Sequence, residues 1–270
     1  MDKILSDKYQ ALLAHLRKLG SVAVAFSGGV DSALLVYAAH EALQDKMLAM
    51  TACSESYPRH EAADADRLLA QLRVNCVQLH LNQLVIPEFV ANTVDRCYHC
   101  KRAIFATFCV EAERRGFKYV ADGANTDDEK DYRPGMKATH ELGIVSPLRD
   151  AQLSKAEIRE LSREFGLFTW NKPSYACLAT RIPYGEPITA AKLNKIERAE
   201  QALLDLGFAE MRVRCHDTVA RIEVPPADFE RVLAAAAAIS EAVKAAGFSY
   251  VALDLEGLRS GSMNETIAKP

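Results

Sequence analysis

Apolar residues follow two alternating patterns along the first two thirds of the chain. Short runs in which nearly every residue is apolar predict buried strands, and longer segments with apolar residues three and four positions apart predict helices. The strands are predicted at 21–26, 47–53, 76–81 and 119–124, and the helices at 3–18, 31–43, 59–73, 97–116 and 154–166. Strands that alternate with helices predict an α/β domain with a mostly parallel sheet covered on both faces.

The pattern changes near residue 180. The segment RIPYGEPIT at 181–189 contains prolines and a glycine and is predicted to be a linker. Beyond it the sequence predicts a helix at 190–206, strands at 211–217 and 219–225, a helix at 227–246 and a last strand at 249–255. This order indicates a smaller C-terminal α+β domain. The chain is therefore predicted to have two domains, at residues 1–180 and 190–270.

The composition is typical of a soluble globular enzyme, with 49% apolar and 26% charged residues. A formal net charge of −3 argues against sequence-independent binding to nucleic acid, which needs a basic face. The N-terminal residues mix charges with apolar positions, unlike a signal peptide, and the apolar run at 232–239 is far shorter than the ~20 residues of a membrane span. We expect a cytoplasmic protein.

The strongest local motif is SGGVDS, which follows the first predicted strand and opens a helix. Its glycines let backbone amides point into the turn, and the helix directs the positive end of its dipole to the same place. A phosphate or pyrophosphate site is therefore predicted at Ser27, Gly28, Gly29, Val30, Asp31 and Ser32. The motif lacks the lysine of the Walker loop, so Mg²⁺ must neutralise the phosphate charge, with Asp31 as the nearest carboxylate. The alternative is an ordinary turn with an aspartate helix cap.

The motif resembles the PP-loop of the ATP pyrophosphatases. The resemblance implies a Rossmann-like domain of the adenine nucleotide α-hydrolase type, which cleaves ATP between its α and β phosphates and transfers AMP to an acceptor oxygen. The adenine would lie at the carboxyl ends of the first strands, near the topological switch point. Two strand-exit loops are placed to contact it, and the candidate residues in them are Ser54, Gly123, Asn125 and Asp128. Ordinary loops rich in Ser, Asn and Asp are the alternative.

Cysteines indicate which nucleophile attacks the adenylate, because the superfamily uses ammonia, amines or sulfur. Cys177 lies in the predicted interdomain loop near Arg181, whose guanidinium would lower the pKa of a neighbouring thiol. In CYHCK, Cys97 and Cys100 are one helical turn apart and share a face.

The CYHCK pair also fits three simpler roles. These are a zinc site completed by Cys215 or His99, a thioredoxin-type redox pair, and a helix without any cofactor. Cys53, Cys76 and Cys109 are predicted to be core residues.

Six motifs in combination resemble the LarE family of ATP-dependent sulfur transferases, which build the nickel-pincer nucleotide cofactor of lactate racemase. They are SGGVDS, CYHCK, DGANTDD, SPLRDAQLSKAEIRELSREFG, PSYACLATRIPYG and LRSGSMNE. The resemblance implies that the carboxylates of pyridinium-3,5-biscarboxylic acid mononucleotide are adenylylated and converted to thiocarboxylates. It further implies a homo-oligomer, a sulfide donor, and other enzymes of the nickel-pincer pathway as partners.

The family uses two sulfur sources. In one mechanism the cysteine at the Cys177 position gives up its own sulfur and becomes dehydroalanine. In the other, three cysteines hold a [4Fe-4S] cluster with one iron open to hydrosulfide, and the matching residues here are Cys97, Cys100 and Cys177. We favour the cluster type, with Cys177, Asp31 and Arg181 as catalytic residues.

The predicted small domain contains candidates for binding the substrate's phosphate. Arg212 and Arg214 share a strand face, with Glu223 nearby, and such a pair suits a phosphate. The family resemblance implies the same contacts, with Arg181 as a further candidate. Arginines paired with acidic neighbours are the alternative. The alanine-rich helix at 227–246 is a candidate subunit interface.

Two other functions compete with this interpretation. A tRNA thiolase uses the same loop, but it would be expected to add a basic face or an RNA-binding domain. A nucleotide-binding module without catalysis would leave the cysteines and the intact loop without a purpose.

Overall fold

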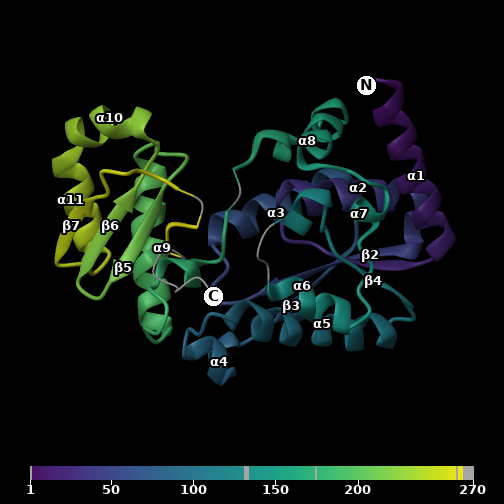
Figure 1. Ribbon diagram of the computed structural model, residues 1–270, viewed down its shortest axis with the longest axis horizontal. Helices are drawn as coiled ribbons and strands as arrows, with labels where there is room; N and C mark the ends of the chain where they lie inside the picture. Colours follow the sequence, from purple (N-terminus) through teal and green to yellow (C-terminus); the bar gives the residue numbers. More distant parts are fainter. Residues whose placement is uncertain (1, 131–133, 174, 260, 264–270) are drawn as a thin grey trace. The chain divides into compact units, whose positions relative to one another are not determined.

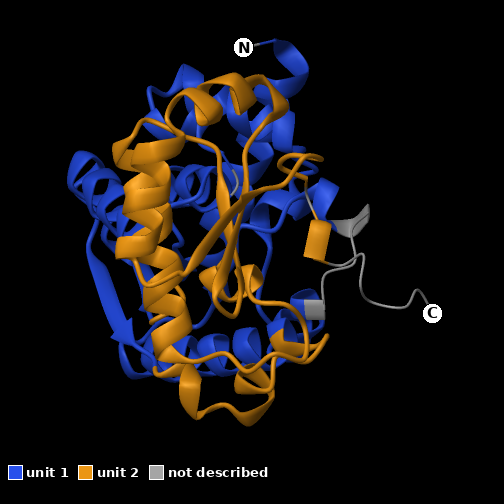
Figure 2. Cartoon of the chain, turned by 90° about the vertical axis from the view of Figure 1, so that its left-hand side faces the viewer, with its two compact units in different colours: residues 1–54, 59–81, 97–175 blue, residues 55–58, 82–96, 176–270 orange. Residues whose placement is uncertain are grey.

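The computed structural model describes residues 2–130, 134–173, 175–259 and 261–263. The chain forms two compact units (Figure 2), the first from residues 1–54, 59–81 and 97–175 and the second from residues 55–58, 82–96 and 176–270. The second unit therefore includes two segments that precede residue 180. The domain limits 1–180 and 190–270 remain a prediction. Within the motifs, Ser174, Ser260, Asn264 and Glu265 lie outside the described residues.

The first unit is built on a parallel four-stranded sheet with the strand order β3-β2-β1-β4. Its strands are β1 (Val22–Ala25), β2 (Met47–Cys53), β3 (Cys76–His80) and β4 (Val120–Ala121). The order reverses direction between β1 and β4, so the carboxyl ends of these two strands flank the topological switch point. The predicted α/β fold class is confirmed.

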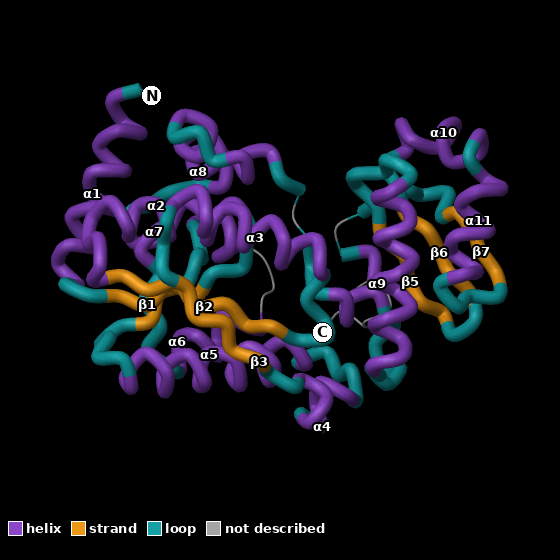
Figure 3. Tube along the Cα trace, turned by 180° about the vertical axis from the view of Figure 1, so that it is seen from behind, coloured by secondary structure: helices purple, strands orange, loops and turns teal. Residues whose placement is uncertain are grey.

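Helices cover both faces of this sheet, as Figures 1 and 3 show. One face carries α1 (Lys3–Leu19), α2 (Val30–Leu43), α3 (Arg59–Leu72) and α8 (Lys155–Glu164), and the other carries α5 (Arg96–Arg114). Side chains alternate along β1, so Val22 and Val24 pack in the first core and Ala23 packs in the second with Phe105. None of the helices in the described part of the chain is long and apolar enough to cross a membrane.

Three short helices are not predicted by the sequence pattern. They are α4 (Pro87–Val90), α6 (Pro134–Glu141) and α7 (Pro147–Asp150). Each begins with a proline, which fits the first helical position because the proline has no N–H to leave unpaired. Helices this short show too few turns for apolar periodicity to reveal them.

The second unit contains a three-stranded mixed sheet with the order β5-β6-β7. In it β5 (Arg212–His216) runs antiparallel to β6 (Val219–Glu223), and β7 (Tyr250–Leu253) runs parallel to β6. The sheet is accompanied by α9 (Ala190–Asp205), α10 (Phe229–Ala234) and α11 (Ala236–Ala245). The single helix predicted at 227–246 is thus two helices, separated at Ala235.

The predicted linker at 181–189 is tied closely to an earlier segment of the same unit. The fully buried Asn92 donates from Nδ2 to the carbonyl oxygens of Pro183 at 2.6 Å and Glu186 at 3.0 Å. The backbone N–H of Gly185 donates in return to the Asn92 carbonyl at 3.1 Å. These bonds join positions about 90 residues apart in sequence. The local composition of 181–189 could not indicate them, and it therefore predicted a linker.

Candidate active site

The SGGVDS motif forms the turn between β1 and α2. Gly28 has a φ of 70°, a left-handed conformation that glycine adopts without strain. Gly29 is the N-cap of α2 and offers no side chain to cover the first amides of the helix. The Ser32 hydroxyl holds the turn together, since it donates to the Gly29 carbonyl at 3.1 Å and accepts from the Ser27 N–H at 3.2 Å.

The backbone N–H groups of residues 28–32 face no acceptor among the residues that the structure describes. A cluster of unpaired donors at the positive end of a 14-residue helix is suited to an anion with several oxygens. The turn therefore fits the phosphates of a nucleotide.

The DGANTDD loop lies directly against this turn. A Cβ atom added to Gly123 would lie 3.0 Å from the Ser32 backbone nitrogen and 3.3 Å from the Asp31 Cβ. The buried Asn125 donates from Nδ2 to Asp31 Oδ1 at 3.2 Å, and Asp128 Oδ2 accepts from the Asn125 N–H at 3.0 Å. The structure thus brings Gly123, Asn125 and Asp128 together with the turn. Ser54 directly follows β2, which is the neighbour of β1 in the sheet.

A lysine that the sequence pattern does not single out completes the group. Lys155 Nζ lies 2.5 Å from Asp31 Oδ2, although the two residues are 124 positions apart. Its own backbone N–H donates to Asp127 Oδ2 at 2.8 Å. The lysine stands inside the SPLRDAQLSKAEIRELSREFG motif, where nothing in the local pattern indicates its partner.

We expect Gly123→Ala to weaken ATP binding about tenfold or more, because the added methyl group would press on the Ser32 amide and displace the turn. The dissociation constant of Mg²⁺-ATP, measured by calorimetry, tests this. The melting temperature should change little, since the clash is confined to the turn. An unchanged affinity would show that this amide does not face the nucleotide.

The seven cysteines fall into two environments. Burial raises the pKa of the thiols of Cys53, Cys76, Cys109 and Cys215, which favours their neutral form. Cys97 and Cys177 are exposed, and Cys100 is half-buried. Of the three cysteines predicted to be core residues, Cys53, Cys76 and Cys109, each is only half-buried. The exposed thiols are better suited to reaction or ligation than the thiols whose pKa is raised by burial.

The structure allows a partial test of the iron–sulfur cluster. Cys97 and Cys100 occupy successive turns of α5 in the first unit, as two ligands of one cluster would, and Cys177 precedes the short helix Leu178–Arg181 in the second unit. Across the described ranges, no three His, Cys, Asp or Glu side chains are grouped so that they could hold a metal ion. The α5 pair thus fits two ligands of a cluster.

Arg181 is fully buried and holds the backbone of the Cys177 loop. It forms a two-fold ion pair with Glu200, Nε to Oε1 at 2.8 Å and Nη2 to Oε2 at 3.1 Å. Its Nη1 also donates to the carbonyl oxygens of Ala176 at 2.8 Å and Cys177 at 3.4 Å. The described contacts of this guanidinium therefore position the loop, and a catalytic role for Arg181 remains a prediction.

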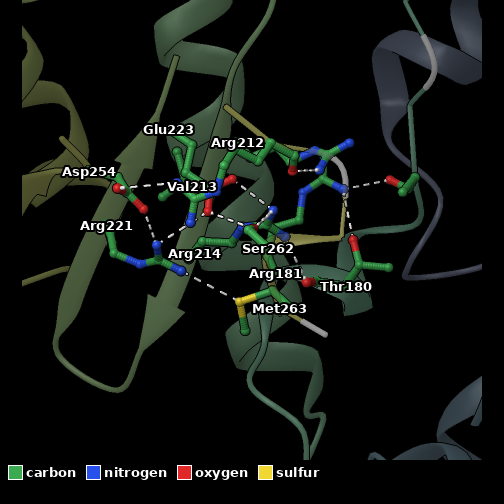
Figure 4. Close-up of polar contacts among 12 residues, drawn as sticks. Thr180, Arg181, Arg212, Val213, Arg214, Arg221, Glu223, Asp254, Ser262 and Met263 are labelled. Atoms are coloured by element: carbon green, nitrogen blue, oxygen red, sulfur yellow. Dashed lines mark hydrogen bonds and ion pairs between the residues drawn. The ribbon is translucent and has the colours of Figure 1, made fainter. Parts of the chain in front are cut away.

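Arg212 and Arg214 have different environments (Figure 4). Arg214 is buried and donates from Nη2 to Glu223 Oε2 at 2.7 Å and to Ser262 Oγ at 2.9 Å. Arg212 is half-buried, and its Nη1 donates to the Arg259 carbonyl at 3.3 Å. Burial and the nearby guanidinium groups of Arg214 and Arg181 lower the pKa of Arg212. An anion beside Arg212 would relieve this repulsion.

Comparison with known proteins adds one family match and three relatives. The asparagine synthase family matches residues 8–123, which include β1, the SGGVDS turn and α2. An uncharacterised protein of Synechocystis sp. is 38% identical over 268 residues, 98% of this chain and 100% of the relative. The pyridinium-3,5-bisthiocarboxylic acid mononucleotide synthase of Lactiplantibacillus plantarum is 38% identical over 266 residues, 98% of this chain and 96% of its own length. GMP synthase (glutamine-hydrolysing) of Bartonella quintana is 27% identical over 231 residues, and the match covers 43% of that enzyme.

Proposed function

The chain belongs to the LarE family of ATP-dependent synthases, and from this premise we propose that it makes pyridinium-3,5-bisthiocarboxylic acid mononucleotide from the corresponding dicarboxylate. A substrate carboxylate oxygen would attack the α-phosphorus of ATP and release pyrophosphate. Sulfur would then displace AMP from the adenylate and leave a thiocarboxylate. The observation that carries the proposal is the cluster of unpaired N–H donors at residues 28–32, in a chain related to such a synthase over nearly its whole length.

Residues of the first unit would bind the nucleotide. The N–H donors of the turn suit the β and γ phosphates, which leave as pyrophosphate. The Asp31 carboxylate supplies an oxygen ligand of the kind that Mg²⁺ prefers, and the metal would neutralise phosphate charge there. Ser54, Gly123, Asn125 and Asp128 would contact the rest of the nucleotide, because they follow β2 and β4 at the carboxyl edge of the sheet.

Residues of the second unit would bind the substrate's phosphate. Arg212 is suited to contact it, because its charge is only partly balanced by the groups around it. Arg214 and Glu223 form a buried ion pair beside Arg212 and would keep the strand face in position. Arg181 would act indirectly by fixing the loop that carries Cys177.

We favour a cluster-dependent source of sulfur, with Cys97, Cys100 and Cys177 as ligands. These three thiolates would hold a [4Fe-4S] cluster, which would supply an iron open to sulfide. The pairing of two cysteines on one helix supports this choice, since sacrificial transfer needs only Cys177. The alternative is sulfur donation from Cys177 itself, which would leave dehydroalanine. The sulfide donor, the homo-oligomeric state and the cytoplasmic location remain predictions.

Release of pyrophosphate from ATP tests the proposed function. We expect release that depends on pyridinium-3,5-biscarboxylic acid mononucleotide, measured with a coupled phosphate assay. Release driven only by tRNA would indicate a tRNA thiolase instead, and no release with either substrate would indicate a nucleotide-binding module.

Metal content and mass separate the two sulfur sources. Protein purified without oxygen should contain about four iron atoms per chain and keep its mass after turnover if the cluster is used. Colourless protein that has lost the Cys177 sulfur after turnover would establish the sacrificial mechanism.

A further inference from the structure

The position of Lys155 is fixed by the start of α8. Ser154 caps this helix through a capping box, in which its hydroxyl accepts from the Glu157 N–H and the Glu157 side chain accepts from the Ser154 N–H. The Lys155 N–H donates to Asp127 Oδ2 in the nucleotide-facing loop. The helix cap and the bond to Asp127 fix the backbone of Lys155. From this position its side chain reaches Asp31 in the first turn of α2.

Binding of a nucleotide would change the balance of charge around Asp31 and Lys155. Asp31 Oδ2 accepts from Lys155, and Asp31 Oδ1 accepts from Asn125. A Mg²⁺ ion bound to Asp31 would compete with the ammonium group for the same carboxylate, since both are cations. The triphosphate would place several negative charges beside the N-terminus of α2, and none of the six residues of SGGVDS is a cation.

We propose that Lys155 is a phosphate ligand of the ATP site, which exchanges Asp31 for an oxygen of the β or γ phosphate when Mg²⁺-ATP binds. Lys155 thus supplies the cation that the SGGVDS turn lacks, although it lies in a distant segment of the chain. The inference rests on the proposed adenylylation reaction and adds a residue to it. Two side chains that are each partly exposed, at 35% for Lys155 and 23% for Asp31, have room for such an exchange.

The lysine would act on the leaving group. When the carboxylate oxygen bonds to the α-phosphorus, the bond to the bridging oxygen breaks and its electron pair stays on pyrophosphate. The Lys155 ammonium group stabilises that growing negative charge and keeps its proton throughout. A donor aimed at charge that develops in the transition state affects kcat as well as binding.

Lys155 could instead have a purely structural role, in which its ion pair with Asp31 only joins α8 to α2. Lys8 provides a matched control for this alternative. Lys8 Nζ pairs with Glu157 Oε1 at 2.6 Å and donates to the Gln152 carbonyl at 2.7 Å, so it ties α1 to the same end of α8. Its side chain is 30% exposed, close to that of Lys155. Lys8→Met therefore removes a similar tether without touching Asp31.

The test compares the full-length wild type with Lys155→Met, Lys155→Arg and Lys8→Met. Calorimetry gives the affinities for Mg²⁺-ATP and for pyrophosphate without the dicarboxylate, and the coupled assay gives kcat. We expect Lys155→Met to weaken both affinities about tenfold and to lower kcat about 100-fold. Lys155→Arg should restore part of the affinity, and Lys8→Met should match the wild type. Melting temperatures should fall equally in the two methionine variants.

The outcomes separate this inference from the proposed function. If Lys155→Met binds ATP and pyrophosphate as tightly as Lys8→Met and turns over as fast, the lysine is only a tether and the inference is wrong. If the wild type binds Mg²⁺-ATP in a way that depends on Lys155 but releases no pyrophosphate with the dicarboxylate, the ligand role stands and the proposed substrate is wrong.

Discussion

Cys177→Ala is expected to lower thiocarboxylate formation about 10³-fold or more, while the pyrophosphate that accompanies formation of the first adenylate is still released from ATP. Both candidate sulfur sources need this thiol, as a cluster ligand or as the donor. The N–H donors of the SGGVDS turn belong to the first unit and Cys177 to the second, so the substitution leaves the residues of the nucleotide site unchanged. Product formation followed by mass spectrometry, together with the pyrophosphate assay, measures both steps in one experiment.

Cys109→Ala is the control for this experiment. Cys109 is a half-buried cysteine whose thiol pKa is raised by burial, and it lies outside the proposed site. This variant should form product at the wild-type rate. Undiminished product formation by Cys177→Ala would contradict both sulfur mechanisms.

Replacing Glu200 with alanine is expected to lower the free energy of unfolding by about 3–5 kcal/mol. Glu200 is 1% exposed and pairs with the fully buried Arg181, so its loss would leave an uncompensated charge in the interior. Glu200 Oε1 also accepts from the Val213 N–H at 2.9 Å, which would lose its partner at the start of β5. Urea unfolding followed by circular dichroism measures the change.

Glu186→Ala tests whether burial of the ion pair causes the large loss of stability expected for the Glu200 variant. Glu186 pairs with Lys192 at 2.9 Å, and its side chain is 37% exposed. Because water screens such a pair, its loss should cost about 1 kcal/mol or less. Equal losses in the two variants would mean that burial of the Arg181–Glu200 pair contributes nothing to stability.

The features that the sequence predicted well depend on neighbouring residues. The apolar run at 47–53 coincides with β2, because a central parallel strand is buried on both faces. The capping box of Ser154 and Glu157 is present because both partners lie within one turn. Gly123 was predicted to contact the nucleotide, which remains a prediction, and the structure places it against the SGGVDS turn because strand-exit loops of a parallel sheet share one edge.

The features that the sequence left out depend on distant partners. The ion pair between Lys155 and Asp31 spans 124 positions, and no periodicity or spacing links them. The same holds for Asn92, whose buried amide makes the segment at 181–189 part of the second unit. The break at Ala235 lies in a run of alanines, in which no residue type marks the end of a helix.

The Asn92 contacts also set an order of events during synthesis. The carbonyl partners of this amide follow it by 90 to 94 residues, so they leave the ribosome about 5–20 s later at usual rates of elongation. During that interval Asn92 and nearby apolar side chains, such as Phe89, lack the contacts that bury them in the folded chain. Residues 82–96 therefore lack their final contacts while the first unit is still being synthesised. A chaperone that binds apolar segments would bind the nascent chain at these residues.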